Sequence, residues 1–200
     1  MDQHLTAFLA ELEQFGVDND EMAASRAERL LNITQDTGVF LHLLVQAVRA
    51  RRILEIGASD GYSTLWLADA ARATGGRVST VECRPERAQM AAANFRRSGL
   101  ASLIDLHVGE AGPHLAGQPA GSVEFLFLDA ERHEYPGFWP ELQRVLAPNS
   151  LLVVDNAVSH QAELAPFVAL VNETEGYLTS LAPVGKGELL ILKVGDVGAR

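Results

Sequence analysis

The chain has 200 residues, of which 48% are hydrophobic and 21% charged, as in ordinary soluble globular proteins. Its net charge of −10 argues against a nucleic-acid surface and suits a neutral or cationic small ligand. The apolar runs are too short to cross a bilayer, no secretory signal is visible, and the single cysteine, Cys83, excludes a disulfide within the chain. We therefore expect one cytoplasmic domain over residues 1–200.

The first fifty residues are predicted to form a helical extension. Residues 2–15 carry apolar side chains at helical spacing, and Gly16 is expected to end this helix. A second helix, capped by the acidic residues at 18–20, is predicted over 21–31. After a break at 32–36, a third and strongly apolar helix is predicted over 37–50.

From residue 51 to residue 194 the pattern alternates between strands and helices, which predicts an α/β core with a mostly parallel sheet covered on both faces. Strands are predicted at 52–56, 77–82, 103–108, 123–128 and 150–154. Helices are predicted at 62–73, 85–98, 134–146 and 159–173, with only a short turn near 110–116.

The last two strand-like segments, 177–183 and 188–194, are joined by four residues with no room for a helix. A connection this short is a hairpin, so we expect about seven strands with the last one antiparallel.

The first predicted strand runs into the turn Gly57-Ala58-Ser59-Asp60-Gly61, and a helix follows. Ligands of open α/β sheets bind at this end of a strand. The glycines are four residues apart, with Ser59 where a dinucleotide-binding turn has its middle glycine. Asp60 would also repel a diphosphate. The turn therefore predicts a nucleotide site that is not built for NAD.

Glu82 ends the second predicted strand, where an acidic side chain can accept both ribose hydroxyls of a nucleoside. The alternative is a solvated acid at a strand end.

Asp129 ends the fourth predicted strand, and Asp155 and Asn156 end the fifth. If these strands are neighbours, three oxygen ligands converge, a set that suits a hard divalent cation such as Mg²⁺. The alternative is that the two aspartates cap the helices that follow them.

His133 and His160 lie just beyond these acids and could serve as a general base or bind a substrate. Ordinary loop histidines are the alternative. Cys83 is interpreted as a packing residue and not as a nucleophile.

Several of these segments resemble one family, the class I S-adenosylmethionine-dependent O-methyltransferases, and within it the cation-dependent catechol and caffeoyl-CoA enzymes. The resemblance runs from about Asn32 to Leu192. The matching segments are EIGASDGYST at 55–64, Glu82, VGEA at 108–111, FLDAERHEY at 127–135 and VVDN at 153–156. It implies a Rossmann-like seven-stranded sheet with a reversed last strand, and commonly a homodimer.

The resemblance also implies roles for individual residues. Those implied to bind S-adenosyl-L-methionine are Ile33, Glu55, Gly57, Ala58, Ser63, Glu82, Ala111, Asp129 and Glu131. Those implied to bind the metal are Asp129, Asp155 and Asn156. The metal would chelate two vicinal oxygens of a small hydroxylated acceptor and lower the pKa of a hydroxyl.

The chain departs from the family where a lysine is often proposed as the general base, because Arg132 stands there. Arginine stays protonated, so the candidates are the metal alone, His133 as the base, or Arg132 as a binder of an anionic substrate group. The acceptor-pocket insertion is also missing after Asn156, and the final turn has Gly185-Lys186-Gly187.

We expect an O-methyltransferase for a small, aromatic hydroxylated acceptor. The first alternative is a methyltransferase for a hydroxylated tRNA base, which a single basic strip would favour, formed by Arg26, Arg29, Arg49, Arg51 and Arg52. The second is a catalytically weak nucleoside-binding or dimerisation module, and an NAD-dependent dehydrogenase ranks last.

Overall fold

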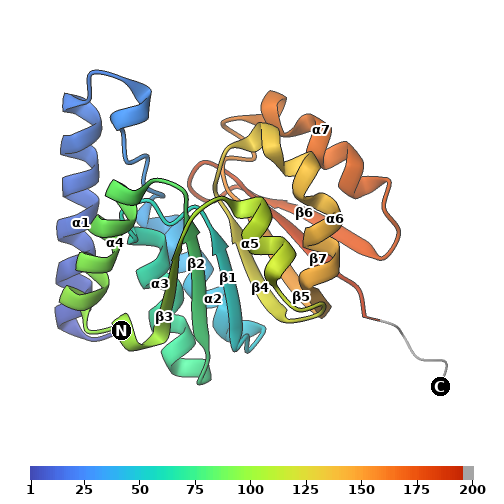
Figure 1. Ribbon diagram of the computed structural model, residues 1–200, viewed down its shortest axis with the longest axis horizontal. Coiled ribbons are helices and arrows are strands. Elements are labelled where there is room, and N and C mark those ends of the chain that lie inside the picture. Colours follow the sequence, from blue (N-terminus) through green and yellow to red (C-terminus); the bar gives the residue numbers. More distant parts are fainter. Residues whose placement is uncertain (196–200) are drawn as a thin grey trace.

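Seven strands form one mixed sheet with the order β3-β2-β1-β4-β5-β7-β6 in the computed structural model, which describes residues 1–195 (Figure 1). The strands are β1 (Arg52–Ile56), β2 (Arg77–Glu82), β3 (Ile104–Val108), β4 (Val123–Leu128), β5 (Leu146–Val154), β6 (Tyr177–Ala182) and β7 (Glu188–Lys193). β7 is antiparallel to both of its neighbours, and the other pairs are parallel. The predicted fold is confirmed, including the reversed last strand.

The helices divide between the two faces of the sheet. They are α1 (Gln3–Met22), α2 (Gln35–Ala47), α3 (Tyr62–Thr74), α4 (Pro85–Ser98), α5 (Ala111–Gly117), α6 (Tyr135–Val145) and α7 (Gln161–Asn172). Short 3-10 turns are η1 (Arg26–Glu28), η2 (Ala101–Leu103) and η3 (Arg132–Glu134). One buried core joins α1 to α4 with one face, and the other joins α5, α6 and α7 with the opposite face (Figure 1).

The side chains of β1 alternate between the two cores, as the sequence of this strand requires. Ile53 belongs to the first core, whereas Leu54 and Ile56 belong to the second. Because successive side chains of a strand point to opposite faces, a strand covered on both faces is apolar throughout. Glu55 is the exception, a fully buried carboxyl in the middle of the sheet.

The predicted end of the first helix at Gly16 is wrong, because α1 continues to Met22. Gly16 is buried inside the helix, and a Cβ there would lie 2.7 Å from the Asn32 side-chain amide. The glycine therefore allows a close approach of residues 23–34, which we call the strap, and does not end the helix.

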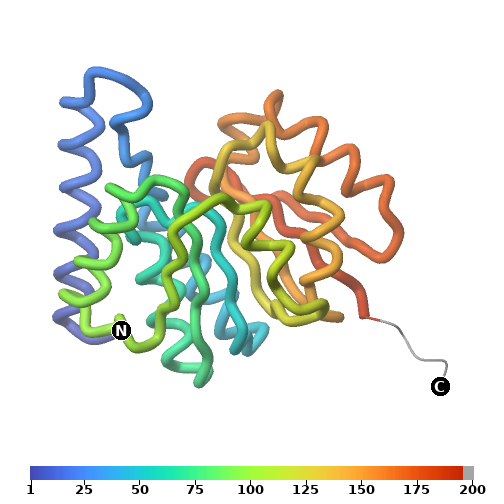
Figure 2. The backbone as a smooth tube through the Cα atoms, in the orientation of Figure 1, coloured from blue at the N-terminus to red at the C-terminus, as the bar shows by residue number. Residues whose placement is uncertain are grey.

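The predicted second helix at 21–31 is also wrong, because only η1 forms there. The strap is held by side chains instead. Asp20 accepts the amides of Leu30 and Leu31 at 2.6 and 3.0 Å, so it does not act as a helix cap. Arg87 of α4 donates to the carbonyls of Ala27 and Leu30, which are then unavailable to a helix. Figure 2 shows the path of the chain after the end of α1.

Smaller differences have local causes. α2 begins at Gln35 because the Thr34 hydroxyl caps it, accepting the amide of Thr37 at 3.2 Å. The turn expected at 110–116 is the short helix α5. β5 begins at Leu146 and not at residue 150, and its pairing with β4 contains a register shift.

Candidate active site

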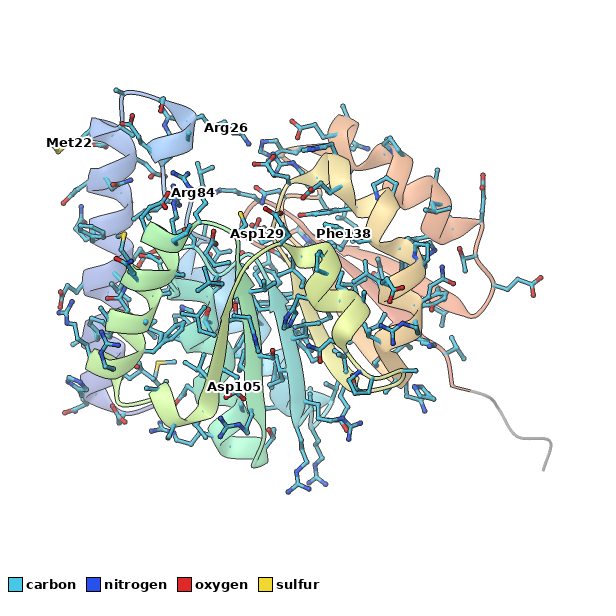
Figure 3. The ribbon with its side chains drawn as sticks, viewed as in Figure 1. Met22, Arg26, Arg84, Asp105, Asp129 and Phe138 are labelled. Carbon is cyan, nitrogen blue, oxygen red and sulfur yellow. The ribbon has the colours of Figure 1, made fainter. Side chains whose placement is uncertain are left out.

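The residues predicted to carry chemistry converge at one edge of the sheet, where the parallel strands end. The chain reverses its winding between β1 and β4, the position at which open α/β sheets bind ligands. Gly57 follows β1, Asp129 follows β4 and Asp155 follows β5, while β7 starts at the same edge because Leu189 pairs with Val154. Figure 3 places Asp129 at this edge, opposite Asp105.

The turn after β1 is packed directly against the end of β4. Gly57 has a φ of 99°, and a Cβ there would lie 2.0 Å from the Asp129 carbonyl oxygen. Only glycine fits, for both backbone and steric reasons. Asp60 is fully buried, and its carboxylate accepts the Tyr62 amide at 3.2 Å. That amide opens α3, so the position a diphosphate would need is already taken from within the turn.

The Glu55 side chain stabilises this turn through hydrogen bonds to the elements around it. Its carboxylate accepts hydroxyl hydrogen bonds from Ser63 and Thr80 at 2.6 Å each, and from Thr64 at 2.5 Å. Complete burial raises its pKa, an effect that these three hydroxyls oppose. The carboxyl thus fixes the first turn of α3 against β1 and β2.

Glu82 joins the turn after β1 to the turn after β2. One carboxylate oxygen accepts the Ser59 amide at 2.8 Å, and the other accepts the Arg84 amide at 2.9 Å. Its side chain is 6% exposed, so the solvated strand-end alternative is wrong. The oxygen that accepts the Ser59 amide keeps a second lone pair for a further hydroxyl, and the other oxygen also receives a weak bond from the Cys83 thiol at 3.7 Å, which a hydroxyl could replace.

Asp129, Asp155 and Asn156 form one hydrogen-bonded group. The Asn156 amide nitrogen lies 3.3 Å from an Asp129 oxygen and 2.7 Å from an Asp155 oxygen. The other Asp155 oxygen accepts the Asn156 backbone amide at 2.7 Å. Neither α7 nor η3 has a side-chain cap, so the helix-capping alternative is wrong.

This group has the chemistry of a site for a hard cation. Burial, and then the neighbouring Asp155, raise the pKa of Asp129 well above its ordinary value, which a bound cation would reverse. Asn156 has a φ of 67°, a backbone conformation that asparagine tolerates, and its amide can rotate to present oxygen. Within residues 1–195 no three His, Cys, Asp or Glu side chains are placed to hold a metal ion, so the third ligand would be Asn156.

The model of the O-methyltransferase family matches residues 4–172. The chain belongs to this family.

Two relatives of this O-methyltransferase family member are catechol O-methyltransferases. The Mycobacterium tuberculosis protein is 36% identical over 139 residues, which cover 68% of this chain and 63% of the relative. The Niastella koreensis protein is 35% identical over 131 residues, which cover 64% of this chain and 59% of the relative. The matched part of the chain thus spans about three fifths of each of these relatives.

Solved structures of similar proteins have the same fold as this chain. The O-methyltransferase TomG from Streptomyces achromogenes, solved in complex with SAM, has a TM-score of 0.74 and 28% identity over 98% of this chain and 91% of that chain. The cofactor-bound protein Rv0187 from MTB has a TM-score of 0.80 and 27% identity over 98% and 92%.

This edge of the sheet does not gather every residue predicted for the site. Gly57, Ala58, Ser63, Glu82 and the three candidate metal ligands lie at this edge, and Ile33 is buried in the strap nearby. His133 is 78% exposed in its side chain and pairs only with the equally exposed Glu131 at 4.0 Å. The structure therefore brings neither His133 nor Glu131 into the group formed by Asp129, Asp155 and Asn156. Cys83 is exposed and does not pack as predicted.

The basic strip that would favour tRNA does not exist as one surface. Arg26 and Arg29 belong to the strap, beside the turn after β1, whereas Arg51 and Arg52 lie at the beginning of β1, on the opposite edge of the sheet. These arginines therefore do not form the continuous basic surface that would favour a tRNA substrate. No helix among residues 1–195 combines the length and apolar character needed to span a bilayer.

Sequence reasoning missed Glu188 at the start of β7. It is fully buried beside Asp155 and accepts the Thr37 hydroxyl at 3.0 Å. A carboxyl opening an otherwise apolar strand, directly after Gly187, was the available signal. Burial, and then Asp155, raise its pKa to about 10.

The raised pKa of Glu188 predicts how the stability of the metal-free protein depends on pH. The folded state holds the proton more tightly than the unfolded chain, whose pKa is near 4.5. The stabilising contribution is therefore complete below that value and is lost as the pH rises toward 10. We expect the melting temperature in EDTA to fall from about pH 5 to about pH 9, and Glu188→Gln to flatten this slope.

Differential scanning fluorimetry measures the effect, with Glu86→Gln, at an exposed position on α4, as the control. A slope in Glu188→Gln equal to that of the unchanged protein would contradict this account of Glu188. Asp129, with its own raised pKa, leaves a residual slope of the same sign.

Proposed function

We propose that the protein is an S-adenosylmethionine-dependent O-methyltransferase that acts on a small, aromatic acceptor with two vicinal hydroxyls and uses a divalent cation, in the first place Mg²⁺. The observation that carries the proposal is the direct contact between Gly57, in the turn after β1, and Asp129, in the oxygen-ligand group. A methyl donor at the turn and a metal-bound acceptor would then be neighbours. The family relationship and the cofactor-bound relatives support it.

The chain's own residues would perform three tasks. Glu82 would accept the ribose hydroxyls, with Ser59 and Arg84 fixing its orientation. Gly57, Ala58 and Ser63 would receive the methionine end, Ile33 would cover it, and Ala111, the first residue of α5, would contact the adenine. Asp129, Asp155 and Asn156 would hold the cation, which supplies Lewis-acid lowering of the acceptor hydroxyl pKa.

In the reaction the acceptor oxygen bonds to the methyl carbon as the bond from sulfur to that carbon breaks. S-adenosylhomocysteine is the leaving group, and the hydroxyl proton passes to water. Opposite charges cancel in this step, so a closed and preorganised site favours it. Arg132 is 7% exposed and donates through Nε to Glu163 at 2.7 Å. A guanidinium does not take up a proton at neutral pH, so we assign Arg132 to binding and not to proton transfer.

Calorimetry and an acceptor panel test the proposal. S-adenosylhomocysteine should bind and NAD should not. With S-adenosylmethionine and Mg²⁺, catechols should be methylated, whereas phenols with one hydroxyl should react far more slowly. Binding of NAD in place of S-adenosylhomocysteine would contradict the cofactor assignment, and cofactor binding without methylation of any acceptor would indicate the binding-module alternative.

We also propose a homodimer and a cytoplasmic location. Val39 and Leu43, one turn apart on α2, are 41% and 59% exposed and give this helix an apolar outer face. Sedimentation analysis of the protein and of Leu43→Lys measures the state of association.

A further inference from the structure

A pocket of about 370 Å³ lies at the edge of the sheet opposite Asp129, where β1, β2 and β4 begin. Figure 3 places Asp105, one of its lining residues, at that edge. The volume is in the range of small-molecule sites. Among the residues that the structure describes, none that we assign to methyl transfer lines this pocket, so its chemistry has to be explained separately.

The pairing of β1 with β2 sets two basic side chains of this pocket side by side. Arg52 and Arg77 are register partners in parallel strands, so their side chains leave the same face of the sheet. Leu54 and Ser79 follow two residues later on each strand and therefore lie on that face as well. All four residues line the pocket, which thus has an apolar wall behind a basic entrance.

Arg77 is fully engaged by the protein. Its Nε and Nη2 donate to the Asp105 carboxylate at 3.2 and 2.9 Å, and its Nη1 donates to the Ser102 carbonyl at 2.6 Å. Every nitrogen of this guanidinium has a partner, and its charge is balanced. Arg77 is therefore a wall of the pocket and not a donor for a ligand.

Arg51 and Arg52, by contrast, have donors to spare. Arg51 uses only its Nε, which donates to the Thr74 carbonyl at 3.3 Å. Arg52 donates through Nε to the Ser122 carbonyl at 2.7 Å and pairs through Nη2 with Glu124 at 2.9 Å. Within residues 1–195, both terminal nitrogens of Arg51 and the Nη1 of Arg52 are without a partner. The two guanidiniums therefore carry more positive charge than Glu124 balances.

A hydroxyl in the pocket lining also lacks a partner. Ser122 lies directly before β4, and its hydroxyl is buried with no hydrogen-bond partner in the described part of the chain. A buried hydroxyl left without a partner costs free energy. An acceptor oxygen on a ligand in the pocket would satisfy it.

We propose that this pocket binds a phosphate monoester with a small apolar body, at a site separate from methyl transfer. The spare donors of Arg51 and Arg52 and the Ser122 hydroxyl together suit the three phosphate oxygens, and guanidinium forks match phosphate geometry. A carboxylate has two oxygens and a single charge, so it would use fewer of these donors. Leu54 and Val123 would contact the apolar body, since both line the pocket.

Calorimetry with phenyl phosphate tests the proposal on metal-free protein, so that no bound cation takes up the phosphate. We expect one phenyl phosphate per chain, bound at least roughly tenfold more tightly than benzoate and more weakly in high salt. Arg51→Gln and Arg52→Gln should each weaken binding by roughly tenfold. Arg96→Gln, at an exposed position in the last turn of α4, is the matched control and should bind as the unchanged protein does.

Amide NMR spectra locate the bound probe without any turnover. The signals of Gly75, Gly76 and Ser122, which line the pocket, should shift when phenyl phosphate is added, whereas those of Gly57 and Ser59 should not. Shifts confined to Gly57 and Ser59, absence of binding, or undiminished binding by both arginine variants would overturn the inference. Equal affinity for benzoate would overturn the assignment to phosphate.

Discussion

Replacement of Asp155 by asparagine is expected to reduce methyl transfer to a catechol by roughly a hundredfold to a thousandfold, the usual range for removing a main electrostatic contributor to catalysis. Asp155 would supply one of two anionic ligands to the cation, and its position is fixed by two hydrogen bonds from Asn156 at 2.7 Å. Calorimetry with Mg²⁺ should show weaker metal binding in parallel.

The control is Asp105→Asn, because Asp105 lies at the opposite edge of the sheet and pairs with Arg77 at 2.9 Å (Figure 3). It should leave methyl transfer unchanged. Melting curves of both variants establish that they are folded. A folded Asp155→Asn protein with undiminished methyl transfer would show that this carboxylate holds no catalytic metal.

Glu82→Ala is expected to weaken S-adenosylhomocysteine binding by at least roughly a hundredfold. Two hydrogen bonds from ribose hydroxyls to a buried carboxylate account for about 3 kcal/mol or more of binding free energy. The substitution also leaves the amides of Ser59 and Arg84 without their acceptor, which loosens both turns around the cofactor.

Isothermal titration calorimetry measures this loss, with Glu86→Ala, at an exposed position in the first turn of α4, as the control. Glu82→Gln keeps the size of the side chain and one acceptor oxygen, so its affinity should fall between the two. An affinity of Glu82→Ala within twofold of the unchanged protein would remove Glu82 from the cofactor site.

Most of the fold could be predicted from the sequence because its strands are covered on both faces. The run from Ile53 to Ile56 is apolar apart from Glu55, and Gly57 follows where the backbone must turn. Asp129, Asp155 and Asn156 could be predicted as one group for the same reason, since parallel neighbours end at the same edge.

The strap could not be predicted, because side-chain hydrogen bonds from distant elements decide its path. Its apolar residues suggest a helix, but Arg87 and Asp20 bind its backbone groups. The end of the first helix was wrongly predicted at Gly16 for a related reason. This glycine permits a close contact with Asn32, a distant residue that the sequence around Gly16 does not indicate. Glu188 became part of the site only when β7 was inserted beside β5 and placed it next to Asp155.

The role of Arg132 also needed the structure. The sequence excluded Arg132 as a base and left three possibilities, namely the metal alone, His133 as the base, or Arg132 as a binder of an anionic substrate group, and its burial against Glu163 fits a binding role.

The most direct measurement is methyl transfer from isotopically labelled S-adenosylmethionine to a catechol, followed by mass spectrometry on one sample in three states: with Mg²⁺, after EDTA, and after Mg²⁺ is restored. We predict label in the methyl ether in the first and third states and a loss of at least roughly a hundredfold in the second. Transfer that continues unchanged in EDTA would contradict the metal site, and absence of label in all three states would contradict the methyltransferase assignment itself.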